Sequence, residues 1–78
     1  MPTILRIGPF RFFFYAGDRT EDPHIHVESE NKIAKFWLDP IRLQNSRGFS
    51  RIDLKKIFDI IGNNREHLLE SWYEYFND

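Results

Sequence analysis

Two of the three histidines in this chain of 78 residues lie two positions apart, within the stretch of residues 22–28. The side chains of a β-strand alternate between its two faces, so His24, His26 and Glu28 would point to the same side. Imidazole changes its charge near neutral pH and is the commonest metal ligand in proteins. These three side chains are therefore candidates for a metal site, for acid–base catalysis, or for a contact surface that holds no metal.

Of these three roles we expect the contact surface. A metal site built from His24, His26 and Glu28 would have only three protein ligands, and Glu28 can instead pair with a lysine on a neighbouring strand. The third histidine, His67, lies on the polar side of a predicted helix and should be exposed, away from the strand surface. We therefore expect no cofactor, and we keep the metal site as an alternative.

Composition restricts the class of protein. The chain has no cysteine, which excludes disulfides and thiolate metal sites. Its 11 basic and 12 acidic residues give a formal net charge of −1, so the chain as a whole does not attract nucleic acid or an anionic membrane. No apolar run approaches the roughly 20 residues of a membrane span, and no basic region followed by an apolar core begins the chain. We expect a cytoplasmic protein with no membrane association.

The clearest structural pattern is a β-hairpin of residues 24–29 and 32–38, whose two-residue loop consists of Glu30 and Asn31. A shift of this register by one residue would turn every side chain to the other face. The apolar face carries the pairs Val27 with Ala34 and Ile25 with Phe36, and the other face carries His24 with Trp37, His26 with Lys35 and Glu28 with Ile33.

Further strands are short. Residues 4–7 and 10–16 predict two strands across the turn Gly8-Pro9, because glycine and proline interrupt regular structure. Residues 41–44 predict an edge strand, followed by a loop. The sheet is thus expected to contain four to five strands.

Helices are predicted over about residues 50–61 and 64–76, each with an apolar stripe of helical spacing. With the strands placed within about residues 3–44, we expect one α+β domain over residues 1–78. It consists of an antiparallel sheet of four to five short strands and a C-terminal helical hairpin that covers one face. The other face of the sheet should stay partly free.

Single residues are expected to end the helices and to build the core. Ser50 should cap the first helix and Gly62 should end it. Phe36 and Trp72 should lie in one core between the sheet and the helices. We expect Phe12 and Phe14 in the core as well, whereas the pattern leaves Phe13 and Tyr15 open.

Five basic residues lie within fifteen positions that contain only Asp53 as an acid. They surround the start of a predicted helix, where backbone N–H groups favour a phosphate. A solvated helix face is the more common outcome of such a pattern. No catalytic signature such as a Walker loop is complete. The five residues are Arg42, Arg47, Arg51, Lys55 and Lys56.

Four stretches together resemble the bacterial family called domain of unknown function 4160. They are residues 4–15, Pro-His-Ile-His-Val at 23–27, Ala-Lys-Phe-Trp-Leu-Asp-Pro at 34–40, and Gly-Phe-Ser at 48–50. One departure is Asp22, where the family often has a second proline. The resemblance implies a small bacterial or phage-borne protein, often encoded beside another small protein in a toxin–antitoxin-like pair, and it brings no agreed active site.

The first functional hypothesis is therefore a small protein of a two-gene module that binds a protein partner encoded nearby, and nucleic acid as a further ligand. Its contacts would come from the free sheet face and from the basic helix start. The expected binding residues are His24, His26, Lys35, Trp37, Arg47 and Arg51.

Two other hypotheses stay open. One is a ribonuclease-like toxin, in which His24 or His26 acts as general acid or base and Lys35 or an arginine stabilises the phosphorane. The other is a metal-binding sensor that uses both histidines and Glu28. Whether the protein is an enzyme, whether it is toxin or antitoxin, and its oligomeric state are not decided by the sequence.

The histidine hypotheses share one structural expectation. Because Ile25 and Val27 already supply the core side of their strand, alternation should turn His24 and His26 away from the helices. We therefore expect both imidazoles to be at least partly accessible to solvent.

Overall fold

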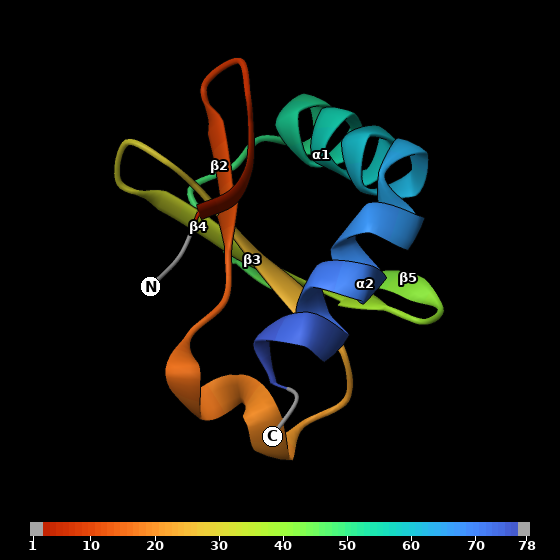
Figure 1. Cartoon of the computed structure of the whole chain (residues 1–78). Helices are drawn as coiled ribbons and strands as arrows, with labels where there is room; N and C mark the ends of the chain where they lie inside the picture. Colours follow the sequence, from red (N-terminus) through yellow and green to blue (C-terminus); the bar gives the residue numbers. More distant parts are fainter. Residues whose placement is uncertain (1–2, 77–78) are drawn as a thin grey trace.

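The computed structural model describes residues 3–76 and consists of a five-stranded antiparallel sheet followed by two helices (Figure 1). The strands are adjacent in the order of the sequence, so the predicted α+β class is confirmed. The elements are β1 (Thr3–Ile7), β2 (Phe10–Phe13), the 3₁₀ helix η1 (Ala16–Thr20), β3 (His24–Ser29), β4 (Lys32–Leu38), β5 (Ile41–Arg47), α1 (Arg51–Asn63) and α2 (Arg65–Tyr75).

The hairpin of β3 and β4 has the predicted register. Val27 pairs with Ala34, and Ser29 pairs with Lys32 across the turn of Glu30 and Asn31. Val27 and Ala34 are both almost completely buried, which explains why a register shifted by one residue is unfavourable.

Two strands end elsewhere than predicted. β5 continues to Arg47 instead of ending at residue 44, because Gln44 is skipped in the pairing and the ladder resumes beyond it. This β-bulge is not visible in the hydrophobic pattern, since most of β5 is exposed. β2 ends at Phe13, and residues 16–20 form η1.

The helices also show one difference. Ser50 caps α1 as predicted, since its Oγ accepts a hydrogen bond from the backbone N–H of Asp53 at 3.1 Å. Gly62 does not end the helix, because α1 continues through Asn63. The end is instead marked by Asn64, whose side-chain Nδ2 donates to the carbonyl oxygen of Ile60 at 2.8 Å.

The core lies between the helices and one face of the sheet. α1 packs on β5 and α2 packs on β4. Phe36 and Trp72 belong to one buried cluster, as predicted, and so do Phe12 and Phe14. Within residues 3–76 no helix is both long and apolar enough to cross a membrane.

The aromatic residues that the sequence left open differ from each other. Phe13 is buried, although it lies on the sheet face opposite the helices, whereas the Tyr15 side chain is exposed. That opposite face, here called the outer face, holds the histidines.

Candidate functional site

The outer face consists of three rows of cross-strand neighbours. These rows follow from the pairings of the five strands, because paired residues point to the same side. The first row is Arg6, Arg11, Glu28, Ile33 and Arg47, the second is Phe13, His26, Lys35 and Asn45, and the third is His24, Trp37 and Arg42.

At one end of this face the two histidines meet a carboxylate from η1. Asp18 Oδ1 lies 3.1 Å from Nε2 of His24, and Asp18 Oδ2 lies 3.0 Å from Nε2 of His26. One ligand atom from each of the three residues lies within 4.8 Å of the other two. We call this group the Asp18–His24–His26 cluster.

A local interaction holds Asp18 in place. Its Oδ2 accepts a hydrogen bond from the backbone N–H of Tyr15 at 2.9 Å, which closes the first turn of η1. The carboxylate thus caps η1 and faces both imidazoles at once, so the short helix and the start of β3 form one unit.

His24 has no exposed surface. Its Nδ1 lies 2.8 Å from the carbonyl oxygen of Asp22. Its Nε2 is close to Asp18 but lacks the alignment of a hydrogen bond, and it is the one buried side-chain nitrogen or oxygen without a partner among residues 3–76. The ring packs between Trp37 and Trp72, with centroid distances of 5.6 and 4.9 Å.

His26 is 9% exposed and lies between two aromatic rings. Phe13 stacks on it at a centroid distance of 5.6 Å, and Tyr15 approaches edge-on at 4.6 Å. Burial lowers the pKa of His26 below its ordinary value, and the nearby charge of Asp18 offsets this effect only in part.

For Asp18, unlike His26, the effect of burial on the pKa is outweighed by a hydrogen bond and by nearby charges. Burial acts to raise the pKa of Asp18, but the N–H of Tyr15 and the charges of His24 and His26 outweigh it. The pKa of Asp18 is therefore lowered, and the group is a carboxylate at neutral pH.

The predicted accessibility of the histidines is wrong, because both rings are buried. Alternation does place them opposite the main core, but η1 covers that end of the outer face. β2 pairs with β3 only as far as His26, so His24 lies beyond the ladder, where Trp72 from the end of α2 packs against it.

The predicted third metal ligand is replaced by another residue. Glu28 forms an ion pair with Arg11 on the neighbouring strand, and Asp18 takes its place at the histidines. The sequence signal for Asp18 was only its place in a polar loop, since nothing in that loop predicts that it folds back over β3.

Of the remaining predicted binding residues, Lys35 and Trp37 are the cross-strand neighbours of His26 and His24, whereas the two arginines lie elsewhere. Lys35 Nζ contacts Glu21 and lies 4.9 Å from the ring centroid of Trp37, and the hydrogen bond from Lys35 lowers the pKa of Glu21. Arg47 lies in the first row, two rows from His24, and Arg51 begins α1, both exposed. The structure therefore brings His24, His26, Lys35 and Trp37 together and leaves Arg47 and Arg51 apart from them.

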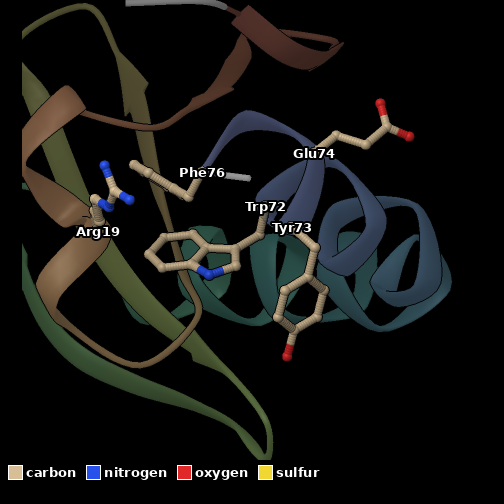
Figure 2. Close-up of a pocket in the computed structure, with 5 residues that line it drawn as sticks. All are labelled: Arg19, Trp72, Tyr73, Glu74 and Phe76. Carbon is tan, nitrogen blue, oxygen red and sulfur yellow. The ribbon is translucent and has the colours of Figure 1, made fainter. Parts of the chain in front are cut away.

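A shallow hollow lies beside the cluster, between η1 and the end of α2. Figure 2 shows Arg19 on one side of it and Trp72 and Phe76 on the other. Trp72 contacts His24, so it lies between the hollow and the buried imidazole.

The third histidine, His67, is exposed on α2, as expected.

Comparison with known proteins gives one result. Neither the curated proteins nor the solved structures contain a match to the chain. The family model described as Domain of unknown function (DUF4160) matches residues 10–73, a span that includes the Asp18–His24–His26 cluster, most of the sheet, α1 and most of α2. The chain therefore belongs to the DUF4160 family.

Proposed function

We propose that the protein is the small component of a two-gene, toxin–antitoxin-like module of the bacterial cytoplasm, and that it binds an acidic protein partner through its outer face. The two-gene module is what the resemblance to the family implies, and the observation that supports an acidic partner is the charge of the outer face. Its three rows hold five basic residues and one acidic residue, Glu28, although the whole chain has a net charge of −1.

Part of this positive charge is not neutralised by the residues that the structure describes. Glu28 pairs with Arg11, and Glu21 from the neighbouring loop pairs with Lys35. Arg6, Arg42 and Arg47 are exposed and form no ion pair with other described residues. A surface of this kind steers an acidic partner and suppresses basic ones.

The outer face also offers apolar contact area. Trp37 and Ile33 are partly exposed, and each pairs with an arginine of β5, Trp37 with Arg42 and Ile33 with Arg47. Tryptophan and arginine are enriched among residues that dominate binding energy at protein interfaces. The buried histidines cannot serve as contacts, so Trp37 and the arginines replace them in this proposal.

The test uses the protein encoded by the adjacent gene. We expect it to bind the full chain in calorimetry, with an affinity that falls as salt concentration rises. Arg42→Glu should weaken binding at least about tenfold, because a like charge then faces an acidic surface. Lys56→Glu is the matched control, since it makes the same charge change on the exposed side of α1.

Equal weakening by the two variants would show that the outer face is not the contact. Binding of single-stranded RNA or DNA, with no binding of the adjacent protein, would favour nucleic acid as the ligand instead. The ribonuclease hypothesis has less support, because His24 has no surface that a substrate could reach. A catalytic role would also require His26 to act from beneath η1.

A further inference from the structure

We propose that Asp18, His24 and His26 form a binding site for a divalent transition-metal ion. The site lies at the end of the outer face that η1 covers, and its three residues are buried, so it is distinct from the exposed side chains of the partner-binding surface proposed above. It also differs from the ligand set that strand alternation predicts, since the carboxylate comes from η1 and not from β3.

The spacing of the three side chains suits metal coordination. Ligands at about 2.0–2.2 Å from a tetrahedral zinc ion lie about 3.3–3.5 Å from one another. Each imidazole nitrogen lies 3.0 or 3.1 Å from one oxygen of Asp18, and the ligand atoms of the three residues lie within 4.8 Å of one another, so movements of the side chains alone would bring them to the spacing of a bound ion. The ligand atoms come from two elements, and η1 brings the carboxylate to the two imidazoles.

The protonation of His24 gives an independent argument. Its Nδ1 lies 2.8 Å from the carbonyl oxygen of Asp22, which can only accept, so Nδ1 carries a hydrogen. In the neutral ring Nε2 is then a bare lone pair that faces a carboxylate oxygen. Two acceptors this close repel each other unless a cation lies between them.

Nε2 of His24 has no hydrogen-bond partner, because its geometry toward Asp18 is not aligned for an N–H donor. An unpaired polar atom with no exposed surface is costly in a folded protein. A metal ion between His24, His26 and Asp18 would satisfy the nitrogen and the carboxylate together.

The contact from His24 to Asp22 also matches the way in which metal-bound imidazoles are held in proteins. A metal-binding imidazole usually donates its other ring N–H to a carbonyl or carboxylate, which fixes the ring and its tautomer. Two imidazole nitrogens and one carboxylate favour zinc, iron, cobalt or copper over calcium and magnesium, which prefer oxygen ligands. The remaining coordination positions would be taken by water.

The first experiment titrates chelator-treated full chain with zinc chloride. We expect one ion per chain in calorimetry and a change in tryptophan fluorescence, because Trp37 and Trp72 both contact His24. Cobalt(II) should give visible absorption of a four- or five-coordinate ion. Zinc should also raise the midpoint of thermal unfolding, since it binds the folded state selectively.

Variants locate the ion. Asp18→Asn keeps the size of the side chain and should weaken zinc binding at least about tenfold, as should His24→Gln. His67→Gln is the matched control, because it removes an exposed imidazole near the start of α2, and it should change affinity less than about twofold. Circular dichroism checks that each variant is folded.

Nuclear magnetic resonance of the wild-type imidazoles keeps the test decisive if a variant fails to fold. Zinc should shift the Nε2 resonances of His24 and His26 and leave those of His67 unchanged. No binding, a shift confined to His67, or an Nε2 proton on His24 that persists at saturating zinc would overturn the proposal. In that last case the cluster is an imidazolium–carboxylate pair.

Discussion

Asp18 lies close to three groups at once, namely the backbone N–H of Tyr15 and the imidazoles of His24 and His26. Its carboxylate caps η1 through Tyr15 and faces the two imidazoles of β3. A buried carboxylate between two buried rings makes the cluster sensitive to protonation, because each proton that enters or leaves changes a charge in surroundings of low polarity. This sensitivity can be measured without a ligand.

Stability in the presence of a chelator should fall as pH decreases below about 6.5, the ordinary pKa of histidine. Burial lowers the pKa of His26 in the folded chain, so the unfolded chain takes up this proton first. The charged or titratable neighbours that act on His26 are Asp18, His24 and Lys35. Urea unfolding at pH 7.5 and 5.5 measures the effect.

The contribution of His26 to that pH dependence is isolated by comparison of variants. His26→Gln should reduce the loss of stability between the two pH values, whereas His67→Gln should leave the loss unchanged. If His26→Gln and wild type lose the same amount, the titration of His26 does not differ between the folded and unfolded chains.

At the scale of elements, the β3–β4 hairpin carries the core on one face and the histidine cluster on the other. Phe36 belongs to the core: it is 1% exposed and lies in the same buried cluster as Trp72. Because the two helices close over this face, the hairpin cannot lose a large core side chain without leaving a cavity.

Phe36→Ala should therefore destabilise the domain by about 3–5 kcal/mol, through lost burial and the cavity that remains. Ile52→Ala is the control, since Ile52 is 70% exposed on α1. Denaturant unfolding compares the two variants with wild type. A loss below about 1 kcal/mol for Phe36→Ala would place this residue outside the structural core.

The elements also show which parts of the fold the sequence can predict. The register of β3 and β4 follows from alternation, since both strands have one apolar face. The bulge at Gln44 does not follow from alternation, because β5 is mostly exposed and its hydrophobic pattern is weak. Gly62 lies inside α1, so a glycine near the expected end of this helix does not mark where the helix ends.

The cluster was only half predictable for a similar reason. The spacing of His24 and His26 follows from the local geometry of a strand, whereas Asp18 reaches them through the path of the chain around η1. A contact that depends on how a loop folds back leaves no period in the sequence. The burial of the rings follows from this same fold of the loop.

At the scale of the whole molecule, charge is distributed unevenly. The outer face holds five basic residues and Glu28, while α2 carries three glutamates and a single arginine. The net charge of −1 therefore hides a basic sheet face and an acidic helix. An approaching acidic partner is attracted to one side of the molecule and repelled by the other.

This asymmetry predicts how the outer-face variants change binding kinetics, if the proposed partner interaction is correct. Exposed charges mainly affect the encounter of two proteins, so Arg42→Glu combined with Arg47→Glu should lower the association rate constant at least about tenfold and change the dissociation rate less. Stopped-flow fluorescence at low and high salt measures both rates. Neutralising Glu70 and Glu74 on α2, by change to glutamine, should instead raise the association rate slightly. A dissociation rate that increases more than the association rate falls would show that the two arginines act within a tightly packed contact and not by steering.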